Sequence, residues 1–385
     1  MGPVIQSVST EQYCGNTVMK VSGGKAWLLA VTAFLCLVVS VFPMYGGDTV
    51  WHDASRYPLI GKAGSASLTR YERLPAALQG KVRDAVWYLG RNSAGLAVRF
   101  RSNSTSVKAK WTSMFSNSMN HMTETGVRGL DLYVLMDGKW RFAGSGRPGG
   151  KTTEAVLVSE MTPEFREYML YLSLYDGVDS LEIGVDEGAV VEMPAVASPS
   201  REKPVVMYGT SILQGGCASR PGMAHTNIIG RCLDREVINL GFSGNALLDF
   251  EIAELMASVP DPGVFVLDYV PNASAGMIDE KGERFFRILR DSHPDVPIVF
   301  IEDPEFPHSV FDASIRAEIE QKNRAQRALY ERLRKSGERR LYYIGSKGMI
   351  GDDGEATVDG IHFTDLGMER YVSHVLPVLK KALRK

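Results

Sequence analysis

The sequence is poor in cysteine, has no excess charge of either sign, and contains no internal repeat or low-complexity tract. Four cysteines in 385 residues are too few for a disulfide scaffold. The 43 basic and 45 acidic residues almost cancel, so we expect no nucleic-acid partner. The composition, 44% hydrophobic and 23% charged, argues against a largely disordered, collagen-like or multi-span membrane protein. At about 150 residues per domain, the length predicts two domains with sizeable cores.

One long hydrophobic run stands near the N-terminus. Residues 26–42 (AWLLAVTAFLCLVVSVF) contain no charged residue and follow Lys20 and Lys25, as in an export signal. The structural alternative, a buried core helix, is disfavoured for a terminal segment that is apolar on all faces. Its seventeen residues are also just enough to span a bilayer, so an uncleaved membrane anchor stays open. We expect residues 1–47 to be an export signal or signal anchor, and the protein to be periplasmic, at the cell surface or secreted.

Two cysteines remain in the mature chain if it is exported. Cys217 and Cys232 can pair in an oxidising compartment or stay as free thiols, and the sequence favours neither. Neither lies in a His/Cys pattern with the spacing of a zinc site, so no metal is expected.

The rest of the chain divides into two halves with different hydrophobic patterns. Residues 48–190 contain alternating runs, including 94–101, 107–111, 129–134 and 170–174, separated by Gly, Asn, Ser and Asp. Such period-two runs predict a β-sandwich. Residues 191–203 read as a linker because they are small, polar and proline-containing.

Residues 204–385 alternate continuous apolar runs with segments of helical period. The apolar runs are 204–208, 236–240, 263–268, 296–301 and 341–344, and the helical segments include 246–258, 276–292, 313–336 and 364–383. Strands that are apolar on both faces predict a parallel sheet covered by helices on both sides, an α/β fold.

Chemistry-bearing residues follow these strands. Ligands of open α/β sheets bind at the carboxyl ends of the strands. Those positions here carry Gly209-Thr210-Ser211, Gly241-Phe242-Ser243-Gly244-Asn245, Val270-Pro271-Asn272 and, before the last helix, Asp359-Gly360-Ile361-His362. A serine, amide donors and an Asp-x-x-His pair are the groups that acyl transfer by serine needs.

These four segments resemble the signature blocks of the SGNH (GDSL-type) serine hydrolases, in the same order. The resemblance implies a three-layer α/β/α domain with Ser211 as nucleophile, Asp359 and His362 as its partners, and Ser211, Gly244 and Asn272 as oxyanion donors. Thr210 replaces the family's usual Asp, and Val270-Pro271-Asn272-Ala273 replaces its usual G-x-N-D. The sequence around Ser211 is similar to a bacterial branch related to carbohydrate esterases. That branch carries an N-terminal, jelly-roll-like β-sandwich with a G-x-D-L-Y motif, which residues 129–133 reproduce.

Each of these residues also has a purely structural interpretation. Ser211 can cap the following helix, Asp359 can cap a turn, and Asn272 can cap a loop. What favours catalysis is the joint occurrence of all four blocks in order at strand ends. The mechanism that follows needs no cofactor and no metal.

The substrate inference rests on the resemblance together with the expected export. Both favour an acetylated poly- or oligosaccharide, such as acetylated xylan, as the substrate partner. A lipid- or thioester-directed hydrolase of the same fold is one alternative, and a non-catalytic surface carbohydrate-binding protein is another. Trp87, Trp111 and Trp140 can stack on sugars or fill the sandwich core. His121 and Arg220 can reach the cleft, although a solvated or salt-bridged arginine is the default.

Overall fold

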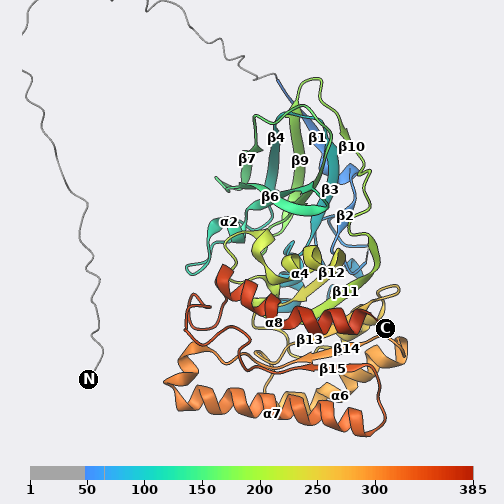
Figure 1. Cartoon of the computed structure of the whole chain (residues 1–385), viewed down its shortest axis with the longest axis vertical. Helices are drawn as coiled ribbons and strands as arrows, with labels where there is room; N and C mark the ends of the chain where they lie inside the picture. The colour runs from blue at the N-terminus through green and yellow to red at the C-terminus, as the bar shows by residue number, and fades with distance from the viewer. Residues whose placement is uncertain (1–47, 65, 385) are drawn as a thin grey trace, which may run out of the picture. The chain divides into compact units, whose positions relative to one another are not determined.

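The computed structural model describes residues 48–64 and 66–384. The expected export segment, residues 26–42, lies outside the described residues. None of the helices between residues 48 and 384 combines the length and the apolar character that crossing a bilayer requires. Figure 1 shows a β part, which precedes an α/β part in the chain.

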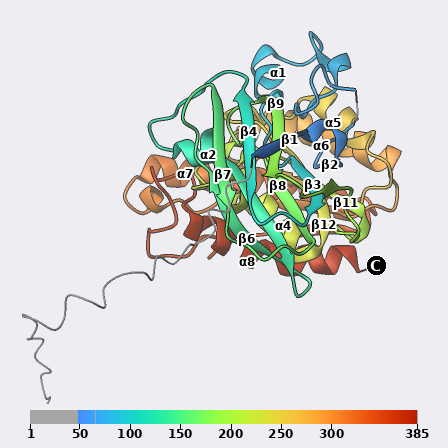
Figure 2. The same ribbon diagram turned by 90° about the horizontal axis from the view of Figure 1, so that it is seen from above.

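The first part is a β-sandwich of two antiparallel sheets. One sheet has the order β1-β9-β4-β7, and the other has the order β10-β3-β8-β5-β6, with β2 paired to β3. The bounds are β1 Thr49–Asp53, β2 Leu59–Ile60, β3 Ala97–Ser102, β4 Val107–Ser113, β5 Leu130–Met136, β6 Lys139–Gly146, β7 Thr152–Val158, β8 Arg166–Tyr171, β9 Val178–Asp186 and β10 Val191–Glu192. Seen from above, strands of both sheets lie in front of the α/β part (Figure 2).

Alternation along the strands places one face of each sheet in the sandwich core. In β4, for example, Val107, Ala109 and Trp111 are buried while the residues between them are partly exposed. The short helices of this region are α1 (Asp84–Gly90) and α2 (Glu124–Val127). The sequence predicted the sandwich, and the runs 94–101 and 170–174 overlap β3 and β8, although their bounds are offset by a few residues.

The second part is a five-stranded parallel sheet with the order β12-β11-β13-β14-β15. Its strands are β11 Arg201–Gly209, β12 Arg235–Gly241, β13 Val264–Asp268, β14 Ile298–Ile301 and β15 Leu341–Ile344. The helices are α3 Ser211–Gln214, α4 His225–Leu233, α5 Phe250–Ala257, α6 Ala275–Ser292, α7 Ala313–Lys335 and α8 Asp365–Leu383, and a 3₁₀ turn, η4, spans Pro307–Val310.

Both faces of this sheet are buried, as the continuous apolar strands predicted. Val205 and Met207 pack with α4 and α8 on one face, and Val206 and Tyr208 pack with α5, α6 and α7 on the other. Figure 1 shows α7 and α8 on opposite sides of β14 and β15. The α/β/α layering therefore follows the sequence pattern.

One predicted helix begins later than expected. The helical period was assigned to residues 246–258, but α5 begins at Phe250. Leu248 has a φ of 57°, a left-handed conformation that interrupts a right-handed helix, and Asp249 is the N-cap residue. The turn after β12 is therefore longer than predicted, and its residues are free to face the carboxyl edge of the sheet.

The two parts share a buried arginine. The Arg73 side chain is 1% exposed and donates hydrogen bonds to four backbone carbonyls. Two of them, on Leu89 and Asn92, belong to the N-terminal part, and the other two, on Asn239 and Gly241, belong to β12. The guanidinium therefore joins the segment around α1 to the parallel sheet.

Candidate active site

Three neighbouring strands bring the sequence-predicted segments to one edge. The last residue of β11, Gly209, pairs with Gly241 of β12 on one side and with Asp268 of β13 on the other. The segments that follow these strands carry Ser211, the turn with Gly244, and Asn272. A Cβ at Gly241 would lie 2.3 Å from the backbone nitrogen of Gln214, so only glycine lets α3 pass this close to β12.

The structure brings Ser211, His362 and Asp359 into one hydrogen-bonded line. The Nε2 atom of His362 lies 2.9 Å from the Ser211 hydroxyl oxygen, and its Nδ1 atom lies 2.7 Å from Oδ2 of Asp359. The Ser211 residue is 7% exposed, and the side chains of His362 and Asp359 are 20% and 34% exposed. The line therefore runs from a nearly buried hydroxyl to a carboxylate near the surface.

The hydrogen bonds of these residues show which side chains cap the backbone and which remain available for chemistry. The hydroxyl of Thr210, not that of Ser211, caps α3 by accepting a hydrogen bond from the Ile212 amide. The Ser211 hydroxyl is consequently left to face His362. Asp359 does both things at once, because its Oδ1 accepts from the amides of Ile361 and His362 while its Oδ2 accepts from the His362 ring.

The carboxylate of Asp359 is held in its charged form. Partial burial raises its pKa, but the hydrogen bonds from the His362 ring and from the amides of His362 and Ile361 outweigh burial and lower the pKa to about 2. A charged carboxylate at Nδ1 places the ring proton on that nitrogen and leaves the lone pair on Nε2. The turn also needs Gly360, whose φ is 91° and whose Cβ would meet the ring of His308.

The predicted oxyanion donors lie on the two loops beside Ser211. Gly244 is exposed in the turn after β12. The Oδ1 atom of Asn272 accepts a hydrogen bond of 3.2 Å from the Ala246 amide, so the two loops are tied together. Among the described residues, 48–64 and 66–384, the amide nitrogen of the Asn272 side chain has no hydrogen-bond acceptor, which leaves it available to a ligand. The Ser243 amide is fixed in turn by Oε1 of Gln214 at 3.1 Å.

The sandwich holds the backbone around Ser211. The Tyr175 hydroxyl donates to the Ser211 carbonyl at 2.9 Å. Asp131, of the G-x-D-L-Y motif, accepts from the Arg220 guanidinium at 2.7 Å and from the Gly222 amide at 2.8 Å. The motif's tyrosine, Tyr133, accepts a second bond from Arg220 at 2.9 Å. The motif therefore braces the loop that follows the serine, and Arg220 is salt-bridged, as its default interpretation had it.

Two further residues lie against the His362 ring. The His121 ring, on the loop before α2, is 5.3 Å from the His362 ring between centroids. The Cys217 amide donates to the Phe363 carbonyl at 3.0 Å, next to His362. Burial and then the charge of Asp359 raise the pKa of the Cys217 thiol to about 12. Cys217 and Cys232 are both free thiols, so the disulfide alternative is not seen in the structure.

The tryptophans considered as sugar-stacking faces are engaged in the structure. Trp111 is 1% exposed in the sandwich core, and Trp87 packs against the core of the α/β part. The indole of Trp140 lies under the Arg99 guanidinium, 4.5 Å from the ring centroid, and donates to the Ser198 hydroxyl. The sandwich-core interpretation therefore holds for Trp111 alone, while Trp87 and Trp140 pack against other clusters.

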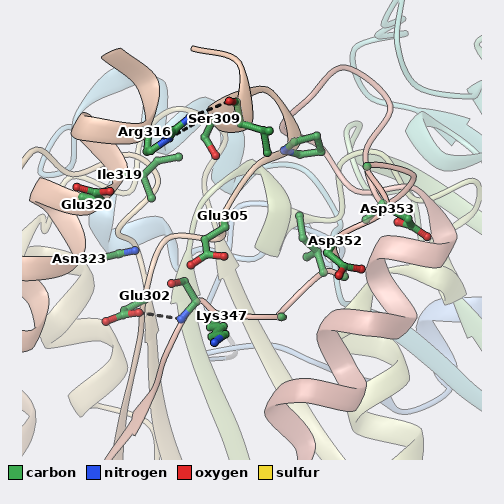
Figure 3. Close-up of a pocket in the computed structure, with 18 of the residues that line it drawn as sticks. Glu302, Glu305, Ser309, Arg316, Ile319, Glu320, Asn323, Lys347, Asp352 and Asp353 are labelled. Atoms are coloured by element: carbon green, nitrogen blue, oxygen red, sulfur yellow. Dashed lines mark hydrogen bonds between the residues drawn. The ribbon is translucent and has the colours of Figure 1, made fainter. Parts of the chain in front are cut away.

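A cavity of about 1060 Å³ opens at the ends of β14 and β15 (Figure 3). Its lining includes Glu305, Lys347 and Asp352, and the segment Gly351–Gly354 precedes the loop of Asp359. Neither Ser211 nor His362 lines it. It is therefore a separate hollow beside the candidate site.

Sequence reasoning missed the residues that support this site from a distance. Tyr175 and Gln214 carry no pattern that distinguishes them from ordinary core or loop residues, and Thr210 was noticed only as the replacement of the family's usual Asp. The only signal was the G-x-D-L-Y motif, which was noticed without a structural role.

Comparisons with known proteins match both parts of the chain. The model of the GDSL-like lipase/acylhydrolase family matches residues 202–380, and the model of the N-terminal domain of SGNH-type esterases (GxDLY) matches residues 49–191. A search of curated proteins found no match.

Solved structures extend the likeness to the whole described chain. A Bacteroides ovatus protein assigned as a GDSL-like lipase is 39% identical, with a TM-score of 0.84, over 88% of this chain and 98% of that one. The salicylyl-acyltransferase SsfX3 of a tetracycline biosynthetic pathway is 16% identical (TM-score 0.70; 88% and 99% covered). A family two carbohydrate esterase from Cellvibrio japonicus is 15% identical (TM-score 0.57; 87% and 98% covered). At such identities the last two share the fold alone.

Proposed function

Because the chain belongs to the GDSL-like lipase/acylhydrolase family, we propose that it is a serine esterase that removes O-acyl groups, acetyl in particular, from carbohydrate such as acetylated xylan. The observation that carries the proposal is the contact of 2.9 Å between the Ser211 hydroxyl and Nε2 of His362. A general base must lie within hydrogen-bond reach of the proton that it removes, and this distance satisfies that condition.

In the first half of the proposed reaction, Ser211 attacks the ester carbonyl. Its proton moves to Nε2 of His362 while the Ser211 oxygen forms a bond to the carbonyl carbon. The Asp359 carboxylate stabilises the imidazolium across the 2.7 Å contact to Nδ1. The imidazolium then returns the proton to the sugar oxygen, the ester bond breaks, and the acyl group remains on Ser211.

In the second half, water replaces the sugar. His362 takes a proton from the water as the water oxygen attacks the acyl carbon, and the proton goes to the Ser211 oxygen as carboxylic acid leaves. Both halves pass through a tetrahedral intermediate with a negatively charged oxygen. Amide donors aimed at that oxygen stabilise it, and we assign this role to the amides of Ser211 and Gly244 and to the Asn272 side chain.

The surroundings of Ser211 support a polar, carbohydrate-borne ester. Ser243 and Asn245 are half-buried polar residues on the loop beside the serine. The carbohydrate esterase of Cellvibrio japonicus shares the fold over 87% of this chain. A short acyl group such as acetyl needs little apolar surface next to Ser211, whereas a long acyl chain needs an extended apolar groove.

Hydrolysis of p-nitrophenyl acetate and p-nitrophenyl palmitate, together with acetate release from acetylated xylan, tests the proposal. We expect activity on the acetate ester and the polymer, and its loss in Ser211→Ala with little change in melting temperature, because the small side chain caps no helix. Preference for palmitate would favour a lipid-directed hydrolase. Binding to xylan without hydrolysis of any ester would favour a non-catalytic carbohydrate-binding protein.

We also propose that residues 26–42 direct export or anchor the protein in a membrane. Fractionation of cells that express the full chain, compared with a variant lacking residues 1–47, tests this. The variant should be retained in the cytoplasm, and equal distribution of the two proteins would contradict the proposal.

A further inference from the structure

Three side chains with metal-ligand atoms converge beside Ser211, although the sequence gave no metal-site spacing. His121, Cys217 and His362 each place one ligand atom within 4.8 Å of the other two. They come from the sandwich, from the loop after α3 and from the loop before α8. We propose that this cluster is an inhibitory site for a soft divalent cation such as Zn²⁺, which switches the esterase off by occupying His362. The effect on activity rests on the proposed function, whereas the binding does not.

The ligand types and their spacing suit zinc. Zinc binds imidazole nitrogen and thiolate sulfur in tetrahedral sites, with metal–ligand distances near 2.0–2.3 Å. Those distances put neighbouring ligand atoms about 3.5 Å apart, so the cluster closes with a movement of about 1 Å. The fourth position stays open to water or to a ligand.

Both histidines already have the hydrogen bonds that orient metal-binding imidazoles. Nδ1 of His362 bonds to Asp359 at 2.7 Å, and Nδ1 of His121 bonds to Oδ1 of Asn120 at 2.8 Å. A ring whose Nδ1–H is donated to an oxygen presents the lone pair of Nε2 to a metal. Each ring therefore keeps one nitrogen lone pair for a cation bound at the cluster.

The segments that carry the three ligands are held together by hydrogen bonds. The Cys217 amide donates to the carbonyl of Phe363, which follows His362. The hydroxyls of Thr123 and Thr125 both donate to the Ser219 carbonyl at 2.6 Å, which joins the loop of His121 to the loop of Cys217. The three ligands are therefore held near one another before a cation binds, so that binding costs less conformational entropy.

The local charge also favours a dication. The Asp359 carboxylate lies 2.7 Å from Nδ1 of His362, so it attracts a cation bound at the cluster. On binding, the Cys217 S–H proton leaves to solvent and a sulfur–zinc bond forms.

Binding at this place has a direct chemical consequence. The Nε2 lone pair of His362 is the one that accepts the Ser211 proton in the proposed mechanism. A metal bound to that lone pair leaves the serine without a base. Inhibition should therefore lower kcat and be reversed by a chelator.

The test uses the full-length protein with Co²⁺ as a spectroscopic probe and Zn²⁺ as the inhibitor. Co²⁺ should give the near-ultraviolet charge-transfer band of a thiolate ligand. The band should be lost in Cys217→Ser and kept in Cys232→Ser, the matched control at an exposed free thiol. Zn²⁺ should inhibit hydrolysis of p-nitrophenyl acetate, and EDTA should restore it.

The variants then locate the site. Loss of the orienting partner in Asn120→Ala should raise the half-inhibitory Zn²⁺ concentration by about tenfold or more. His121→Gln and Cys217→Ser should raise it at least as far, with inhibition measured relative to the activity of each variant without Zn²⁺. If Co²⁺ binds through Cys217 but no ester is hydrolysed, the proposed function fails and the metal site stands. Inhibition and a cobalt band that persist unchanged in both ligand variants would overturn the site.

Discussion

Asn272 has two candidate roles in the structure, and two different substitutions separate them. Its Oδ1 accepts from the Ala246 amide at 3.2 Å, which ties the loop after β13 to the turn after β12. Its amide nitrogen is left to donate to the oxyanion. Asn272→Ala removes both the acceptor and the donor. Asn272→Asp keeps an oxygen to accept from Ala246 but removes the donor and adds a negative charge.

The two roles differ in the quantity that they change. An oxyanion donor stabilises a charge that is absent from the ground-state ester, so its loss costs about 10²–10³ in kcat, roughly 3–4 kcal/mol. KM should change little, because the interaction forms only in the transition state. The loop tie is one neutral hydrogen bond, with a net contribution of about 1 kcal/mol to the free energy of unfolding. In a chain of this size that corresponds to a Tm shift of about 2 °C or less.

Steady-state kinetics and thermal unfolding on the same purified variants decide between the roles. Both variants should lose kcat by two orders of magnitude or more, with Asn272→Asp at least as slow as Asn272→Ala. Only Asn272→Ala should unfold at a lower temperature. A variant that keeps its kcat while its Tm falls would remove Asn272 from the oxyanion hole and leave it as a loop tie.

Three other properties can be measured. The Asp359 carboxylate should stay charged from pH 4 upward, because hydrogen bonds overcome partial burial and keep its pKa at about 2; a carboxyl titration of Asp359 above pH 4, followed by NMR, would contradict this. Arg220→Met should lower the Tm more than Asp131→Asn, since it leaves a fully buried carboxylate without its cation at a cost of about 3 kcal/mol or more; equal losses would refute the asymmetry. Burial raises the pKa of the Asp268 carboxyl to about 7, above the unfolded value of about 3.9. The stability that the protonated carboxyl contributes is therefore fully present below about pH 3.9 and is lost as the pH rises to about 7. Asp268→Asn should therefore raise the Tm at pH 8 but not at pH 4, and the same shift at both values would rule out this titration.

The sequence predicted the parts of the fold in which burial leaves a local pattern. The five apolar runs became the five strands of the parallel sheet, because strands covered on both faces lack polar alternation. The late start of α5 was missed, since the left-handed backbone at Leu248 leaves no composition signal. The sandwich strands were predicted less completely, because half-exposed strands of an antiparallel sheet give weaker patterns.

The candidate site also contains both residues that the sequence predicted and residues that it missed. Ser211, Asp359 and His362 were predicted as a group from short motifs, and the structure places them in hydrogen-bond contact. The neighbours of His362 from other segments, His121 and Cys217, depend on the packing of the sandwich against the α/β part. No local spacing encodes that packing, so the convergence of these ligand atoms is visible only in three dimensions.

The buried guanidinium of Arg73 constrains the order in which the two parts of the chain can fold during synthesis. Arg73 precedes its acceptor Asn239 by 166 residues in the chain. At about 5–20 residues per second, the ribosome makes that acceptor roughly 8–30 s after the arginine. Until then the guanidinium has to stay hydrated, because burying it with only part of its acceptors carries the cost of an unpaired charge. The segment around α1 therefore completes its folding only after β12 has been made, and the two halves of the chain reach their final state together.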